Sequence, residues 1–78
     1  MKNLINFSGL EEIIRTAIKL SMFSARDIAE EIKMSNSGMY CFTSGQNHIS
    51  VNKGDEILSF LKDNDPMALQ AATDLYFK

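Results

Sequence analysis

Apolar residues recur at steps of three and four along most of the chain, which is the spacing of one face of an α-helix. The clearest run predicts a helix over residues 10–20, preceded by Ser8 as an N-cap whose partner in a capping box is Glu11. The charged residues of this segment fall outside the apolar stripe, and we expect them to be solvated: Glu11, Glu12, Arg15 and Lys19.

Two short helices are predicted next, each begun by a serine. Ser24 has an acidic residue three positions later and starts a helix over residues 24–33. Ser35 caps a second helix over residues 36–43. The pair Ser44-Gly45 ends this helix, because glycine tolerates a left-handed turn.

The C-terminal third of the chain predicts two further helices. A loop over residues 46–50 leads to a helix over 51–61, which is capped by Ser50 or Asn52. Gly54 weakens this helix by about 1 kcal/mol relative to alanine. A final helix is capped by Asp65 and has Pro66 at its first position, where the missing N–H costs nothing. No segment alternates with a period of two residues, so no sheet is expected.

These segments predict an all-α fold and one domain over residues 1–78. Within it, a helix-turn-helix spans about 24–45 and a C-terminal helix spans about 65–77. The predicted core brings together Ile28, Ala29, Ile32, Met39, Phe42, Ile57 and Leu61. Met39 and Tyr40 are adjacent, so if Met39 packs inward, Tyr40 and Thr43 face out.

The spacing of the two short helices is that of a helix-turn-helix, in which the second helix is presented to the DNA major groove. The segment from Ser24 to Ser35 resembles that of the lambda-repressor-like (Xre-type) regulators. Ile28-Ala29 matches their Leu-Ala pair, and Met34 matches their buried turn residue. The resemblance extends over residues 10–61 and implies a compact five-helix bundle of the lambda-repressor-like type.

Departures from this family weaken the chemistry of DNA binding. Ala25 stands where the family has a glutamine, Lys33 replaces the turn glycine, and Gln46-Asn47 replaces a basic pair. The sequence has no Lys or Arg between Met34 and Asn52, and the formal net charge is −2. Because cationic contacts to phosphates supply much of the affinity for DNA, direct DNA binding is disfavoured.

A small acidic chain of this kind also resembles the modulators of repression of temperate phages of Gram-positive bacteria. That resemblance implies a phage-type repressor as partner and a role in a genetic switch, in which this chain modulates the repressor's operator binding. The alternative is a repressor that binds operator DNA directly as a dimer. Acidic and uncharged polar residues are expected to contact the partner or DNA: Asp27, Glu30, Glu31, Asn36, Ser37, Tyr40, Thr43, Gln46, Asn47 and His48.

The final helix is apolar on nearly all sides, so we expect one half to pack on the domain and the other half to be available for a homodimer. The alternative is that the core of a single domain buries the whole helix. No apolar run approaches the length of about 20 residues that a membrane span needs, and the N-terminus does not resemble a signal peptide. We therefore expect a cytoplasmic protein without membrane contact. Cys41 is expected to pack as a small hydrophobe, and His48 has no ligand neighbour, so no metal, cofactor or enzymatic activity is expected.

Overall fold

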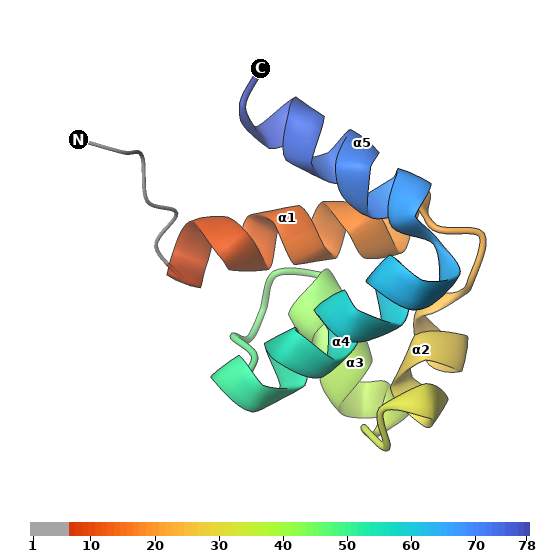
Figure 1. Cartoon of the computed structure of the whole chain (residues 1–78). Helices are drawn as coiled ribbons and strands as arrows, with labels where there is room; N and C mark the ends of the chain where they lie inside the picture. Colours follow the sequence, from red (N-terminus) through yellow and green to blue (C-terminus); the bar gives the residue numbers. More distant parts are fainter. Residues whose placement is uncertain (1–6) are drawn as a thin grey trace.

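The computed structural model describes residues 7–78, with side chains from Gly9 onward. This part of the chain forms five α-helices: α1 (Phe7–Leu20), α2 (Ala25–Glu31), α3 (Asn36–Thr43), α4 (Val51–Asn64) and α5 (Pro66–Tyr76) (Figure 1). No strand occurs within residues 7–78. The prediction of a compact all-α fold is thus confirmed, with a Cα radius of gyration of 11.7 Å.

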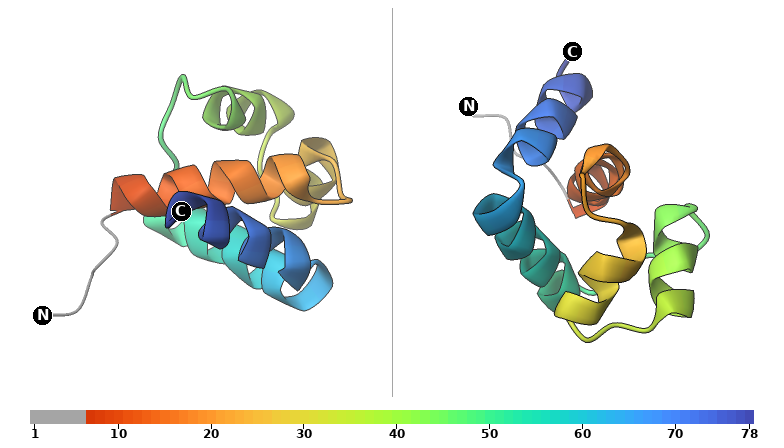
Figure 2. Two further views of the ribbon diagram at one scale, coloured as in Figure 1. Left: turned by 90° about the horizontal axis from the view of Figure 1, so that it is seen from above. Right: turned by 90° about the vertical axis from the view of Figure 1, so that its right-hand side faces the viewer.

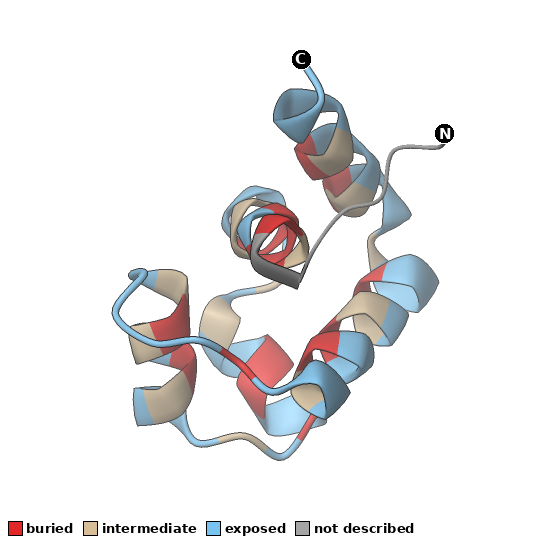
Figure 3. Cartoon of the chain, turned by 90° about the vertical axis from the view of Figure 1, so that its left-hand side faces the viewer, coloured by how far each residue is buried: buried red, intermediate tan, exposed pale blue. Residues whose placement is uncertain are grey.

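The first helix, α1, lies at the centre of the bundle. Seen nearly end-on in Figure 3, it is surrounded by the other helices, whose buried residues turn toward it. Its most extensive packing is against α5, and it also contacts α3 and α4. The short helix α2 packs mainly on α3 and more lightly on α4, so α2 and α3 lie on one side of α1 and α5 on another (Figure 2).

Four of the helices begin at the caps that the sequence predicts. The hydroxyl oxygens of Ser24, Ser35 and Ser50 each accept a hydrogen bond from the backbone N–H three residues later, over 3.0–3.1 Å. Asp65 caps α5 in the same way, with Pro66 at the start of the helix. Its second carboxylate oxygen accepts from the Ser21 hydroxyl and the Met22 N–H, which ties the end of α1 to the start of α5.

The start of α1 differs from the prediction. The helix begins at Phe7, so Ser8 lies inside it rather than at the N-cap. The side chain of Ser8 lies outside the described residues. The expected capping partner, Glu11, instead directs both carboxylate oxygens to the loop after α3. The prediction was wrong because a contact with a remote segment took the carboxylate away from its local role.

The predicted core is confirmed, since all seven residues named for it are buried in one cluster. The cluster also contains the apolar stripe of α1 and two later residues, in the list Ile13, Ile14, Ala17, Ile18, Ile49 and Ala72. Met34 is partly buried against this cluster. It occupies the turn between α2 and α3, where the resemblance placed a buried residue.

The turns that end α2 and α3 share one hydrogen-bond pattern. After α2, the Met34 N–H donates to the Ala29 carbonyl over 2.8 Å, and Lys33 N–H donates to Glu30 over 3.3 Å. After α3, Gln46 and Gly45 N–H make the equivalent bonds. Both are Schellman turns, which need a left-handed residue. That residue is Lys33 (φ 58°) in the first turn and Gly45 (φ 87°) in the second.

Candidate functional site

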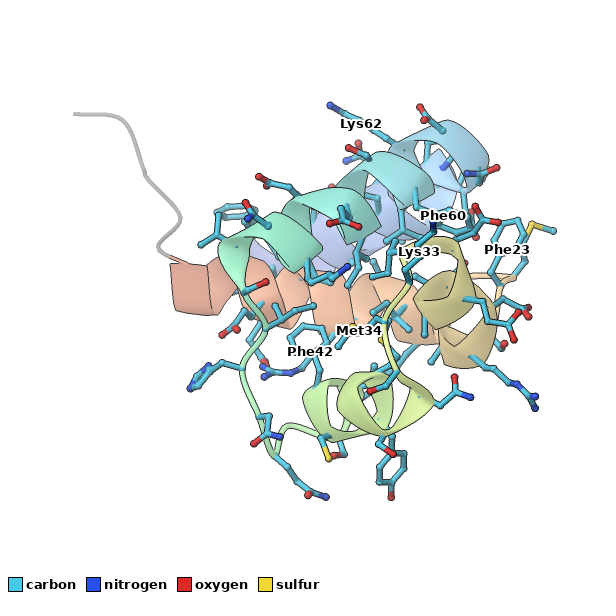
Figure 4. The ribbon with its side chains drawn as sticks, turned by 90° about the horizontal axis from the view of Figure 1, so that it is seen from below. Phe23, Lys33, Met34, Phe42, Phe60 and Lys62 are labelled. Atoms are coloured by element: carbon cyan, nitrogen blue, oxygen red, sulfur yellow. The ribbon has the colours of Figure 1, made fainter. Side chains whose placement is uncertain are left out.

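The structure divides the predicted contact residues between two surfaces, one on each side of α2. Asp27, Glu30 and Glu31 line a groove between α2 and α4. Asn36, Tyr40 and Thr43 line a hollow between α2 and α3. In Figure 4, α4 lies above and α3 below, with α2 between them at the right. The other predicted residues line neither surface: Ser37 lies at the start of α3, and Gln46, Asn47 and His48 lie in the loop after it.

The groove between α2 and α4, called here the acidic groove, consists of two adjoining hollows of about 430 and 410 Å³. Six of the chain's ten acidic residues line it: Asp27, Glu30, Glu31, Asp55, Glu56 and Asp63. The three acids of α4 were not among the predicted site residues. A helical wheel of residues 51–64 shows them on a polar stripe. The wheel does not show that this stripe faces α2, because that depends on how the helices pack.

Aromatic residues line the same groove. The rings of Phe23 and Phe60 meet edge to face, with centroids 5.2 Å apart and an interplanar angle of 75° (Figure 4). Both side chains are half-buried against the core and also line the groove. Apolar surface rimmed by charged groups is typical of protein-binding sites rather than of a purely solvated face.

Few cations balance these carboxylates. Glu30 pairs with Arg26 at 3.9 Å, and Glu56 pairs with Lys53 at 3.4 Å. Among the side chains described, no Lys, Arg or His nitrogen lies within ion-pair distance of Glu31, Asp55 or Asp63. The groove therefore has a negative potential, which repels phosphates and attracts a basic surface.

The surface of α3 is polar and nearly uncharged. Tyr40 is 66% exposed, as predicted, and Asn36 and Ser37 are exposed beside the start of the helix. Thr43 was predicted to face outward, but its side chain is half-buried. Its hydroxyl donates a hydrogen bond to the Tyr40 carbonyl over 3.2 Å. The hollow of about 270 Å³ beside Tyr40 is also lined by Arg26 of α2, a cation that sequence reasoning did not assign to this surface.

The loop after α3 contains the remaining predicted residues, and α1 holds it in place. Gln46 and Asn47 are exposed as expected. The sequence shows no carboxylate at metal-ligand spacing from His48, but the fold brings a remote one to it: Nδ1 of His48 lies 2.8 Å from Oε1 of Glu11. Oε2 of Glu11 accepts the Ile49 N–H, also over 2.8 Å. Glu11 was expected to be solvated, yet only 1% of it is exposed.

The surroundings of Glu11 favour its ionised form. Burial raises the pKa of Glu11, but the hydrogen bonds from Ile49 and His48 and the charges of His48 and Arg15 outweigh burial and lower the pKa overall. A carboxyl group with a lowered pKa stabilises the fold above its ordinary pKa. That stabilisation is lost as the pH falls through the lowered value.

Arg15 also departs from its expected place on the solvated face of α1. Its Nε donates to the Phe42 carbonyl over 2.6 Å, and a terminal nitrogen donates to the Asn47 carbonyl over 3.0 Å. The guanidinium carbon lies 4.6 Å from the centroid of the Phe42 ring. Only 14% of the Arg15 side chain is exposed. The guanidinium therefore caps the C-terminal end of α3, where a positive charge is favourable.

One half of α5 packs on the domain, as predicted. Ala68 and Ala72 are buried, while Met67, Leu75 and Phe77 are exposed. A homodimer through this face stays a prediction. None of the helices in residues 7–78 has both the length and the apolar character needed to cross a membrane.

Among the described side chains, no group of three or more potential ligands is arranged to hold a metal ion. Comparison with known protein families, with curated proteins and with solved structures finds no match to this chain. The candidate site is therefore defined by its own geometry: an acidic groove with aromatic lining beside a nearly uncharged α3 surface.

Proposed function

We propose that this chain is a small transcription regulator with a lambda-repressor-like helix-turn-helix fold, which binds a partner repressor and modulates that repressor's operator binding. The observation that carries the proposal is the distribution of charge around α2. On one side lie six carboxylates with an aromatic lining, and on the other lies an α3 surface with few charges. This arrangement suits a basic protein better than it suits DNA.

The lack of cations on α3 favours a protein partner over DNA, because affinity for DNA comes largely from cations that neutralise phosphates. α3 contains no Lys or Arg. Arg15 lies close to α3 but is engaged with backbone carbonyls, and Arg26 is 3.9 Å from a carboxylate of Glu30. A duplex approaching α3 would also approach the acidic groove, whose charges would repel it.

The proposed mechanism uses the repressor's own DNA-binding face. That face must be basic, so the acidic groove would steer it into contact. Tyr40 is exposed beside small polar residues, and tyrosine is enriched among residues that dominate binding energy. A repressor held in this way would have its DNA-binding face covered, and operator binding would fall by mass action.

The second candidate is direct operator binding as a dimer, in the cytoplasm like the first. It is favoured by the α2–α3 pair itself, with α3 begun by Ser35 and with Arg26 beside the α3 hollow. In this case α3 would read bases, and the apolar face of α5 would join the two subunits.

Biolayer interferometry with a purified phage-type repressor as the binding partner distinguishes the two candidates. Glu31→Lys is expected to slow association with the repressor about tenfold, because electrostatic steering acts on the association rate. Asp74→Lys makes the same charge change on α5, where Asp74 accepts a hydrogen bond from Gln70 and lies outside the acidic groove, and it should leave the rate unchanged. Equal effects of both variants would contradict steering by the acidic groove. A nanomolar operator complex that is lost in Tyr40→Ala would favour direct DNA binding instead.

A further inference from the structure

Glu11 and His48 join a buried carboxylate to an exposed imidazole. The Glu11 side chain is 1% exposed and the His48 side chain is 83% exposed, and Oε1 lies 2.8 Å from Nδ1. The other carboxylate oxygen accepts the N–H of the buried residue Ile49. One edge of the imidazole is thus attached to the core, while the rest of the ring faces solvent.

The partners of Glu11 determine which ring nitrogen carries the proton. An ionised carboxylate can only accept hydrogen bonds, so Nδ1 of His48 must donate to it. In a neutral imidazole, the second nitrogen Nε2 then keeps its lone pair.

The charged groups around Glu11 agree with this assignment. Arg15 lies one turn further along α1 and favours the ionised carboxylate. The helix α3 packs against α1 and contains no Asp, Glu, Lys, Arg or His. On α4, Lys53 donates to the Ile32 carbonyl, and on α5, Asp74 accepts from Gln70, so these groups are engaged elsewhere.

We propose that Glu11 is a positioning residue that holds His48 in its Nδ1–H form, which makes Nε2 an exposed hydrogen-bond acceptor for an ammonium, guanidinium or amide N–H of a partner protein. The nature of the partner rests on the proposed function, whereas the position of the proton does not. Gln46 and Asn47 in the same loop are exposed and uncharged. A cationic donor can therefore approach Nε2 without meeting a like charge on these neighbours.

Nitrogen-15 NMR of the imidazole tests the position of the proton, and the single histidine of the chain makes the signals unambiguous. In the neutral ring, we expect a protonated Nδ1 and an unprotonated Nε2. In Glu11→Gln, the amide oxygen can accept the Ile49 N–H only if the amide NH₂ faces the ring. The proton is then expected to move to Nε2.

Glu12→Gln is the matched control, because Glu12 is exposed and pairs only with Arg15 among the described groups. It should keep the wild-type ring signals, and circular dichroism melts establish that each variant is folded. Two results would overturn the assignment: a neutral wild-type ring protonated on Nε2, or a proton that stays on Nδ1 of the neutral ring in Glu11→Gln.

Binding of the repressor tests the contact itself. Glu11→Gln is expected to weaken the complex about tenfold, since a surface acceptor becomes a donor, while Glu12→Gln should leave the affinity unchanged. If the proton moves but Glu11→Gln binds the repressor as tightly as wild type, the contact at Nε2 is disproved. The Glu31→Lys measurement still decides the proposed function independently.

Discussion

The turns before and after α3 have the same backbone hydrogen bonds but are held in different ways. The first turn has Lys33 in the left-handed region and Met34 packed on the core, and it receives one remote side chain, Lys53 of α4, which donates to the Ile32 carbonyl over 2.7 Å. The second turn uses Gly45 and also receives Arg15 and Glu11 from α1, across 27 to 38 positions of sequence. The turn before α3 thus receives one side chain from α4, whereas the end of α3 and the loop after it receive two side chains from α1.

Phe42→Ala should destabilise the end of α3, where Arg15 binds, more than any other substitution considered. Phe42 is fully buried beneath the Arg15 guanidinium, so we expect its removal to cost about 3–5 kcal/mol of the free energy of unfolding. Urea denaturation followed by circular dichroism measures the loss. Tyr40→Ala removes an exposed ring from the same helix and should cost far less; equal losses in the two variants would contradict the packing described for α3.

Arg15→Met should have the next largest effect. Methionine keeps much of the aliphatic stem but removes the donors to the Phe42 and Asn47 carbonyls. Hydrogen bonds from a charged group are worth about 1.5–3 kcal/mol, and we expect a destabilisation in that range. Lys19→Met on the exposed side of α1 is the control in the same denaturation experiment. A comparable loss in both variants would show that the Arg15 contacts do not stabilise the end of α3.

Gly45→Ala tests the backbone of the second turn alone. A Cβ atom at this position meets nothing within 4 Å, so the expected cost of about 1–2 kcal/mol arises from the left-handed conformation itself. Thermal unfolding by calorimetry should show a lower melting temperature. An unchanged melting temperature would mean that the turn can change its conformation without loss of stability.

Lys33→Gly should give the smallest effect and the opposite sign. Glycine relieves the left-handed strain of the first turn but also adds freedom to the unfolded chain, so the net gain is about 0.5 kcal/mol. Lys62→Gly is the control within regular helix, at an exposed side chain that points away from the body (Figure 4). It should instead destabilise by about 1 kcal/mol. Destabilisation by Lys33→Gly would show that the lysine side chain stabilises the fold by more than the left-handed backbone conformation of Lys33 destabilises it.

Most of the fold could be predicted because its signals are local. Each cap joins a side chain to a backbone N–H three residues away, so Ser24, Ser35 and Asp65 could be identified from spacing alone. The apolar stripes are equally local, which explains why the predicted core is confirmed. The end of α4 was placed three residues early, because polar residues at the end of a helix carry no periodic signal.

The polar residues at the centre of the molecule could not be predicted in this way. Glu11 and Glu12 look as solvated as Glu30 and Glu31, yet Glu11 alone of the four is buried. Its partners lie 37 and 38 residues later, and nothing in the local pattern connects them. The acidic groove was missed in part for the same reason, since its α4 residues join those of α2 only when the helices pack.

The most extensive helix–helix contact joins α1 to α5, and this affects how the protein folds during synthesis. α1 is made before α5, the helix with which it makes its most extensive contact. Until residues 66–76 have left the ribosome, α1 lacks its contacts with α5. Docking of α5, secured where Asp65 binds the end of α1, should therefore be the step that makes the newly synthesised bundle resistant to proteases.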